Sequence, residues 1–168
     1  MVGLLNDIND KMTLGFREEG DIIYVLGNCT NDINSSQYLS KLQQVEYSPA
    51  PYFDLEEEYV LQQKLASLIR KRLVRSVHDV SEGGLFVTLC ESGFESGLGF
   101  SVQTKGGIRK DACLFGEGQS RVVVTVSIDE VKNFEAALGN LPFEKIGVVS
   151  EGEVVVDGDF WGTIEAWK

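Results

Sequence analysis

The sequence predicts one α/β (α+β) domain in which helices pack on a mixed sheet, and three observations support this expectation. The runs at 22–27 and 121–127 are apolar and rich in β-branched residues, which is typical of buried strands. Residues 54–74 carry leucines at spacings of three and four, as on one face of a helix. Strand-like and helix-like stretches alternate without a repeat, a low-complexity tract or a linker. Residues 1–168 are therefore expected to form a single domain.

The first strand is expected at 22–27, where a glycine closes the apolar run. A short helix should follow it, with Ser35 and Ser36 as the two candidate capping residues and Gln44 at its end. Two prolines in the stretch 48–51 then interrupt the chain before the next element begins.

The clearest element is the helix predicted over 54–74. Asp54 precedes it and Glu57 lies three residues later, which resembles a capping box. Glutamates gather at its start and arginine and lysine residues at its end, an order that complements the helix dipole. The residues expected on its buried face are Leu61, Leu65, Leu68, Ile69 and Leu73.

The second half of the chain is expected to alternate between strands and helices. Glycines and polar turns mark the boundaries of these elements. Asp129 is the expected cap of the last helix, and the last two strands are expected to form a hairpin. The predicted strands cover 75–80, 98–104, 121–127, 143–150 and 152–156, and the predicted helices cover 85–91 and 129–138.

Charge and cysteine content argue against several classes of function. The 168 residues include 15 basic and 26 acidic side chains, a net charge of −11. Such a surface repels nucleic-acid phosphates and anionic lipids, so neither is an expected partner. Cys29, Cys90 and Cys113 are far apart and form no Cys-x-x-Cys pair, which argues against a zinc site or a disulfide framework and indicates a reduced, cytoplasmic protein. His78 is the only histidine, which excludes a multi-histidine metal site, and no metal ligand is expected.

The first stretch that could carry chemistry is 77–85, where a strand ends in polar residues, two glycines follow and a helix begins. Backbone N–H groups in this arrangement can face an anion, which makes Ser81, Gly83 and Gly84 candidate phosphate ligands. The alternative interpretation is structural: Ser81 caps the helix and the glycines relieve crowding. Both interpretations stay open, with the structural one favoured.

The same stretch contains a possible acid–base pair, His78 and Asp79, to which Ser81 would add a hydroxyl. Residues this close together at a strand end point to alternate faces, so they rarely converge. We therefore expect no catalytic residue here and interpret His78 as a structural residue.

The second stretch lies directly before the valine-rich strand. Gly116 and Gly118 allow a ligand to approach the backbone, and Gln119, Ser120 and Arg121 supply hydrogen-bond donors. These five residues are the best local candidates for a phosphate site in a negatively charged chain. The stretch is not a P-loop, because Gly-Lys-Ser/Thr is absent and a strand follows where that motif has a helix. A glycine-rich entry to a hairpin, with Arg121 paired to a carboxylate, is an alternative of equal weight.

Together these two stretches resemble a known family. Residues 77–85 (VHDVSEGGL) and 115–124 (FGEGQSRVVV) are similar to the paired signatures of the large subunit of phosphoribosylformylglycinamidine synthase. The resemblance is to a C-terminal domain of the aminoimidazole-ribonucleotide-synthase (AIR synthase) type. Residues 13–21 and 165–168 also resemble the beginning and end of that domain, so the resemblance covers nearly the whole chain.

The resemblance implies a parent enzyme of purine biosynthesis. This ATP-dependent ligase converts formylglycinamide ribonucleotide and ammonia to formylglycinamidine ribonucleotide, with Mg²⁺ as cofactor and with ammonia from a glutaminase subunit or domain. Its catalytic histidine, its magnesium carboxylates and most ATP contacts lie in N-terminal modules whose motifs this chain lacks. The resemblance therefore implies an inactive fragment whose partners are the missing N-terminal modules.

The glycine-rich stretch also indicates which of the family's two repeats is present. The first repeat carries a segment like Ser-Glu-Ser-Gln-Glu-Arg, whereas residues 116–121 resemble the second repeat, whose pseudo-active site can hold an auxiliary nucleotide. Two alternatives remain: a stand-alone interaction or scaffold domain of the same fold, and the C-terminal module of a related synthase or kinase. The stretch Phe-Gly-Glu-Gly-Gln-Ser-Arg argues against the second alternative.

Overall fold

A seven-stranded mixed sheet forms the centre of the molecule. The computed structural model describes residue 5 and residues 7–168. The strand order is β2-β4-β1-β5-β3-β6-β7, and neighbouring strands are antiparallel except for β3 and β6, which are parallel. The predicted mixed sheet with packed helices is thereby confirmed. The strands are β1 (Ile22–Leu26), β2 (Ser76–Asp79), β3 (Gly99–Val102), β4 (Val122–Val126), β5 (Phe143–Ser150), β6 (Glu153–Val156) and β7 (Asp159–Thr163).

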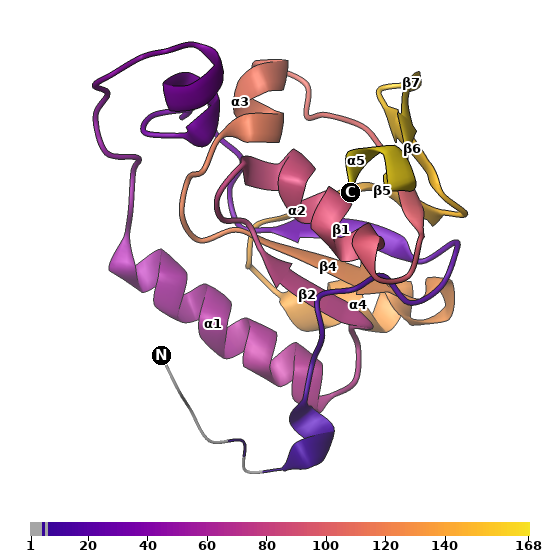
Figure 1. The fold of residues 1–168 in the computed structure, drawn as a ribbon. Helices are drawn as coiled ribbons and strands as arrows, with labels where there is room; N and C mark the ends of the chain where they lie inside the picture. Colours follow the sequence, from indigo (N-terminus) through magenta and orange to yellow (C-terminus); the bar gives the residue numbers. More distant parts are fainter. Residues whose placement is uncertain (1–4, 6) are drawn as a thin grey trace.

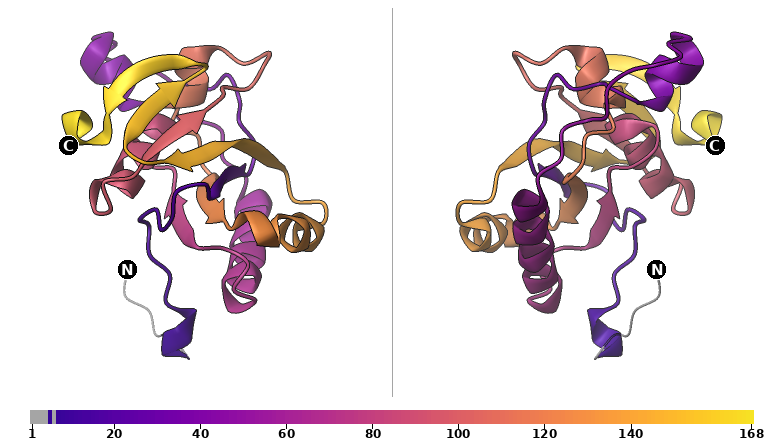
Figure 2. Two further views of the ribbon diagram at one scale, coloured as in Figure 1. Left: turned by 90° about the vertical axis from the view of Figure 1, so that its right-hand side faces the viewer. Right: turned by 90° about the vertical axis from the view of Figure 1, so that its left-hand side faces the viewer.

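Helices cover both faces of this sheet, with α2 on one face and α1 and α4 on the other (Figures 1 and 2). Shorter helical segments lie at the edges and between strands. The helices are α1 (Leu55–Arg70), α2 (Gly84–Phe94), α3 (Lys110–Phe115), α4 (Val131–Leu138) and α5 (Ile164–Trp167), and the short turns are η1 (Ile8–Asp10), η2 (Tyr38–Leu42) and η3 (Ile128–Glu130).

Strand β1 shows how the sequence produces these layers. Ile23 and Val25 belong to the core cluster that α2 also enters, whereas Ile22, Tyr24 and Leu26 belong to the cluster that α1 and α4 enter. All five side chains are buried. Because β1 is covered on both faces, its sequence is apolar throughout rather than alternating.

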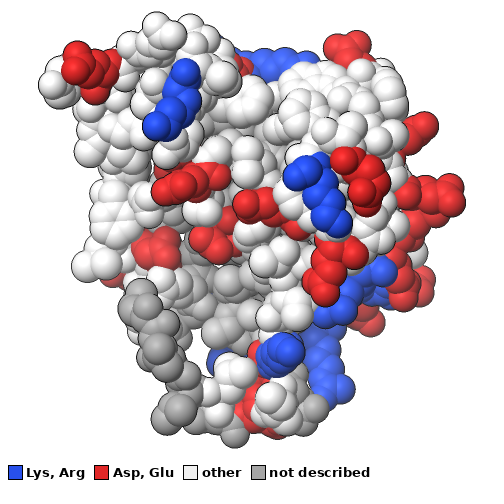
Figure 3. All heavy atoms as spheres, in the orientation of Figure 1, with Lys and Arg blue, Asp and Glu red and all other residues white. Residues whose placement is uncertain are grey.

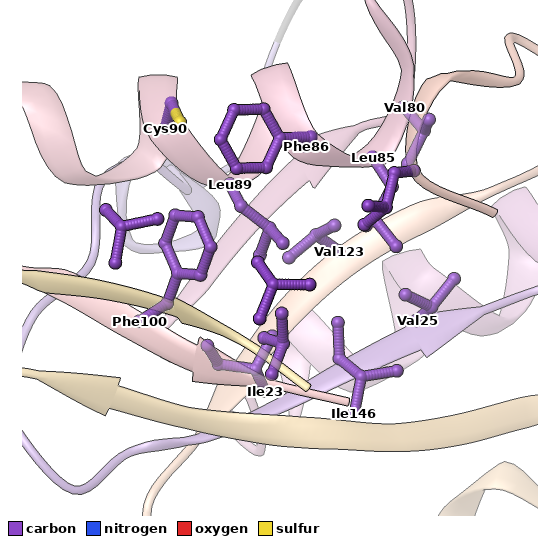
Figure 4. Close-up of a cluster of buried hydrophobic side chains, with 14 of the residues drawn as sticks. Ile23, Val25, Val80, Leu85, Phe86, Leu89, Cys90, Phe100, Val123 and Ile146 are labelled. Atoms are coloured by element: carbon purple, nitrogen blue, oxygen red, sulfur yellow. The ribbon is translucent and has the colours of Figure 1, made fainter. Parts of the chain in front are cut away.

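Figure 4 shows the core between α2 and the sheet. Phe86 and Leu89 project from α2 toward the strands, where Phe100 of β3 and Val123 of β4 belong to the same cluster. None of these four side chains is more than 3% exposed. Burial of side chains of this size contributes roughly 1.5–3 kcal/mol each. This layer fixes α2 on the sheet, and with it the turn from which α2 starts.

Helix α1 begins as predicted and ends earlier. The Asp54 carboxylate accepts two hydrogen bonds of 2.9 Å from backbone N–H groups of the first turn, so Asp54 is the N-cap residue. The helix stops at Arg70 rather than Val74, because the chain turns at Arg72, which has a left-handed backbone conformation (φ 56°). Of the predicted buried face, Leu61 and Leu68 are buried, and Leu65, Ile69 and Leu73 are partly buried.

The expected hairpin of 143–150 with 152–156 is wrong. Strand β5 pairs with β1 and β3, and β6 pairs with β3 and β7, so β3 lies between the two strands. The turn from β5 to β6 crosses the beginning of β3 at Gly99, where a Cβ atom would overlap the carbonyl oxygen of Glu153. Glycine at this position permits the crossing. The two strands were predicted to form a hairpin because they are close in the sequence. The strand order in the sheet depends instead on the tertiary contact at Gly99.

Two expected helix caps also differ from the structure. The short helix after Ser36 is η2, a π-helical turn whose N-cap position is Gln37 and not Ser35 or Ser36. The Ser36 hydroxyl nevertheless accepts a hydrogen bond from the backbone N–H of Leu39 at 3.3 Å. This turn ends at Leu42, earlier than expected. Asp129 does not cap the last predicted helix, because it lies inside the turn η3 and the N-cap position of α4 falls on Glu130.

Helix α3, strand β7 and the short turn η1 were not predicted, whereas α5 lies where residues 165–168 resemble the last helix region of the family. Helix α3 has six residues and starts after Arg109 without a side-chain cap, so the sequence carries no start signal for it. Strand β7 is an edge strand with exposed and half-buried residues, and α5 has four residues. Elements this short owe their conformation to packing on the rest of the domain.

Replacing Leu68 with aspartate is expected to destabilise the protein strongly. Leu68 on α1 is 1% exposed, so the variant places an unpaired carboxylate in the core at a cost of several kcal/mol. Leu55→Asp is the matched control, because Leu55 begins the same helix and is 73% exposed. Urea unfolding followed by circular dichroism should show a lower midpoint only for Leu68→Asp. Equal midpoints for the two variants would contradict the packing of α1.

Candidate functional site

The two glycine-bearing stretches meet at one end of the neighbouring strands β2 and β4, and a single carboxylate joins them. Glu117 Oε1 accepts a hydrogen bond from the backbone N–H of Gly83 at 2.9 Å and another from the backbone N–H of Gln37 at 2.7 Å. Gly83 is the N-cap residue of α2, and Gln37 is that of η2. We call this arrangement of Glu117, Gly83 and Gln37 the Glu117 clasp. It ties together three segments that lie far apart in the sequence.

Close backbone packing accompanies the clasp. Gly84 has a φ of 72°, and a Cβ atom at this position would lie 2.7 Å from the carbonyl oxygen of Gly116. We call residues 116–121 the glycine loop. Because Gly84 has no side chain, α2 can start directly against this loop, in agreement with the structural interpretation in which the glycines relieve crowding. Ser81 does not cap α2, because the N-cap position is Gly83, and Ser81 is exposed.

The Glu117 carboxylate occupies the position at the start of α2 where an external anion could bind. N–H groups at the start of a helix favour negative charge. The sequence suggested a phosphate at Gly83, and the structure places the Glu117 carboxylate on its N–H group. The next N–H group, that of Gly84, donates to the carbonyl oxygen of Ser81 at 3.1 Å. Both N–H groups of the turn are therefore satisfied within the chain.

Arg121 holds the glycine loop together from inside. Its side chain is buried, with the residue 5% exposed. Its Nε donates to the carbonyl oxygen of Gly118 at 3.1 Å, and its Nη2 donates to the carbonyl oxygen of Gly116. These partners are carbonyl oxygens, not the carboxylate that the structural alternative expected. The loop is thus folded around the guanidinium group.

Three cavities meet at Ser120, with volumes of about 430, 240 and 130 Å³. Ser120 has a left-handed φ of 59°, which is uncommon for a residue with a side chain. Its hydroxyl oxygen is buried and has no hydrogen-bond partner in the described part of the chain. Gly118 and Gln119 line the 240 Å³ cavity beside it. The structure thus brings three of the expected phosphate candidates to one cavity.

Carboxylates surround these cavities. Acidic side chains gather in the middle of the face that Figure 3 shows. Because like charges repel, a free anion entering here is disfavoured unless a positive charge accompanies it. The acidic residues that line the three cavities are Asp32, Asp54, Glu56, Glu57, Glu58 and Asp79.

The histidine faces α2 rather than its neighbour in the sequence. His78 Nδ1 lies 3.1 Å from the Ser92 hydroxyl, and His78 Nε2 lies 3.4 Å from the Glu91 carboxylate. Asp79 is exposed, so the acid–base pair considered from the sequence does not form. Ser92 is buried and donates to the carbonyl oxygen of Thr88 at 2.8 Å. The histidine therefore joins β2 to α2, as a structural residue would; its partners could not be identified from the sequence, because their spacing from His78 has no motif.

The chain belongs to a recognised class of domain. Residues 18–158 match the family described as "AIR synthase related protein, C-terminal domain". This match covers most of the chain, and the chain belongs to this family. The resemblance on which the sequence analysis relied is thereby confirmed at the level of the domain.

Curated relatives make the comparison more specific. Over 178 residues the chain is 35% identical to the phosphoribosylformylglycinamidine synthase subunit PurL of Alkaliphilus metalliredigens, a match that covers 100% of this chain and 24% of the relative. It is 36% identical over 160 residues to the corresponding subunit of Caldanaerobacter subterraneus subsp. tengcongensis, with 94% and 22% covered. The chain thus spans about a quarter of the length of the relatives it matches.

Solved structures show the same fold. The structure described as T. maritima PurL complexed with FGAR superposes with a TM-score of 0.77 at 17% identity, over 95% of this chain and 29% of that one. A thiamine-monophosphate kinase from Stenotrophomonas maltophilia gives a TM-score of 0.60 at 21% identity, over 88% and 53% of the two chains. The fold is therefore shared by PurL and by a kinase.

Removing the Glu117 carboxylate is expected to lower the free energy of unfolding. Glu117→Ala leaves two N–H groups without their acceptor, and hydrogen bonds to charged groups contribute about 1.5–3 kcal/mol each. Glu117→Gln keeps an amide oxygen at the same place, so its expected loss is only about 1 kcal/mol. Glu82→Ala is the control, since Glu82 is an exposed carboxylate in the adjoining turn. Urea unfolding should rank the variants in this order; similar midpoints for all three would show that the clasp does not stabilise the fold.

Proposed function

We propose that this chain is the C-terminal module of an ATP-dependent ligase that converts formylglycinamide ribonucleotide and ammonia to formylglycinamidine ribonucleotide in purine biosynthesis. The observation that carries the proposal is the similarity to PurL subunits along the whole chain. Structures of T. maritima PurL complexed with FGAR and with ATP, which share the fold, agree with these substrates. The likeness to a kinase is one of fold alone, so that alternative is not favoured.

The proposed partners are the missing N-terminal modules and a glutaminase that supplies ammonia. The PurL relatives are about four times as long as this chain, which leaves most of such an enzyme to other modules. A structure of PurLQS from Thermotoga maritima is among those that share the fold. The net charge of −11 disfavours nucleic acid and anionic lipid as partners. No helix in the described residues has the length and apolar character needed to cross a bilayer.

The proposed module has no synthase activity of its own. Its histidine is engaged with Ser92 and Glu91 in joining β2 to α2. Among the described residues, no three side chains of the kinds that bind metal ions lie together. We assign ATP and Mg²⁺ to the whole enzyme, because the family resemblance places the motifs that bind them in the N-terminal modules. The free thiols of Cys29, Cys90 and Cys113 agree with the proposed cytoplasmic location.

Within the whole enzyme, the glycine loop is proposed to face the phosphate of an auxiliary nucleotide. Gly118 supports this role, because the space beside its backbone is open and a ligand can approach it. Within residues 7–168 the Ser120 hydroxyl has no hydrogen-bond partner, and Gln119 is exposed. Gly116 and Arg121 contribute by fixing the shape of the loop. Because carboxylates surround the cavities, we expect the nucleotide to require an accompanying positive charge.

The activity of the isolated chain tests the proposed division of labour. Purified chain supplied with formylglycinamide ribonucleotide, ATP, Mg²⁺ and ammonium should release no product above the blank, whereas a polypeptide of full PurL length that contains it should turn over. Product formation by the isolated chain that disappears on His78→Ala would overturn the assignment.

Weak nucleotide binding by the isolated chain is a separate expectation. The isolated chain holds only part of the proposed nucleotide site, and carboxylates surround that part. We therefore expect it to bind Mg²⁺–ADP with a Kd weaker than about 1 mM. Backbone amide shifts should concentrate at 118–120 and decrease in Gly118→Ala, which adds a methyl group in open space without a clash. Gly106→Ala is the matched control, because its surroundings are equally open. Shifts that spread elsewhere, or that Gly118→Ala leaves unchanged, would return the loop to a purely structural role.

A further inference from the structure

A cavity of about 440 Å³ lies between α2 and the last elements of the chain. Residues of η2 and α2 line one part of it, and residues of α3, β7 and α5 line the rest. Helix α2 contacts both α3 and α5 (Figure 1). We call this space the aromatic cavity, because most of its larger lining side chains are rings. The aromatic residues that line it are Tyr38, Phe86, Phe94, Phe115, Trp161 and Trp167.

The rings of the aromatic cavity pack around Phe86, which is 3% exposed. The centroid of the Phe86 ring lies 4.9 Å from that of Trp167 and 5.2 Å from that of Trp161. It lies 5.9 Å from the centroid of Phe115, on which Tyr38 stacks at 5.2 Å with an angle of 5° between the rings. Because the rings already pack against one another, a ligand that enters has few side chains to order.

The lining of the aromatic cavity favours a flat aromatic ligand. Aromatic rings attract one another in edge-to-face and offset-stacked arrangements, which a second flat ring system can continue. The volume of the cavity lies in the range of small-molecule sites, and an apolar lining with few polar groups is typical of such sites. Trp167 is 44% exposed, so the cavity opens to solvent beside it.

The charges around the aromatic cavity differ from those around Ser120. Among the described residues that line the aromatic cavity, only Lys41 is charged. Lys41 is exposed and forms no ion pair with any described acidic group. Six carboxylates line the three cavities that meet at Ser120, whereas none of the described residues lining the aromatic cavity is acidic. An unpaired lysine beside a cavity without carboxylates selects a negatively charged ligand, even in a chain of net charge −11.

The Glu117 clasp holds Lys41 in place beside the rings. Gln37 and Gly83 both line the aromatic cavity, and both donate their backbone N–H groups to Glu117. The clasp therefore fixes η2, which carries Lys41, against the start of α2. The charged end of the cavity thus keeps its position relative to the aromatic part.

We propose that the aromatic cavity binds a small molecule with a flat aromatic body of two rings and one carboxylate. The aromatic body packs among the rings around Phe86, and the carboxylate pairs with Lys41. The side chain of Gln37 supplies a further hydrogen-bond donor. This inference goes beyond the proposed ligase function and is independent of it, because it concerns a cavity other than those at Ser120 and only groups within this domain.

Binding of 2-naphthoate by the purified chain tests the proposal. 2-Naphthylmethanol and 2-naphthylmethylamine are neutral and cationic controls of nearly the same shape. Titration calorimetry should give one site with a Kd of about 10–100 µM for the naphthoate, weaker binding of the alcohol and the weakest binding of the amine. Both tryptophans of the chain line the cavity, so their indole N–H signals in the NMR spectrum should shift when naphthoate is added.

Two variants separate the charged from the aromatic part of the site. Lys41→Gln should weaken naphthoate binding roughly threefold to fivefold, the value of an exposed ion pair, and leave the binding of the alcohol unchanged. Lys132→Gln is the matched control, because Lys132 is an exposed lysine on α4, on the other face of the sheet. Trp167→Ala should weaken the binding of both compounds by about tenfold. Trp167 is 44% exposed at the end of the chain, so we expect this variant to keep the fold.

Several results would overturn the proposal. One is the absence of naphthoate binding up to about 1 mM, and another is an amine that binds as tightly as the naphthoate. Equal effects of Lys41→Gln and Lys132→Gln would remove the role of Lys41. Indole signals that move with the concentration of the protein alone would show that a second copy of the chain covers the cavity. Amide shifts confined to 118–120 would place the naphthoate in the cavities at Ser120 instead.

Discussion

The hydrogen bonds to the Glu117 carboxylate fix the geometry of the edge at which the candidate site lies. One oxygen holds Gly83 at the start of α2 and Gln37 at the start of η2. Helix α2 is anchored at the same time by its apolar side chains on the sheet. The glycine loop is held at its other end by the Arg121 guanidinium, after which β4 begins. The position of the loop therefore follows from the sheet through α2 and the clasp.

The clasp also limits which groups of the two glycine-bearing stretches are free for the proposed ligand. The start of α2 has the form of an anion site, yet the chain supplies the anion itself. What remains for an external ligand is the outer part of the glycine loop, where Gly118 is open and the Ser120 hydroxyl has no partner in the described residues. This division agrees with a module that contributes part of a site and depends on neighbouring modules for the rest, in particular for positive charge.

Sequence reasoning succeeded where the signal was local. The apolar run of β1 and the capping carboxylate of Asp54 act on their own segments, so both could be predicted. The place of β3 between β5 and β6 depends on a backbone crossing at Gly99, which no local pattern reveals. Both glycine-bearing stretches were singled out from the sequence, and the structure brings them together, but the role of Glu117 between them was missed. A carboxylate in an acidic chain is ordinarily a solvated surface group, and only the fold brings distant N–H groups to it.

Amide hydrogen exchange at Gly83 and Gln37 tests the clasp most directly. These N–H groups lie in turns, where exchange is ordinarily fast, and their acceptor is a side chain. We expect both amides to be protected in the native protein compared with Gly106, and we expect Glu117→Ala to remove this protection while the amides of β1 stay protected. Exchange at Gly83 and Gln37 as fast as at Gly106 in the unaltered protein would show that Glu117 does not hold these two amides.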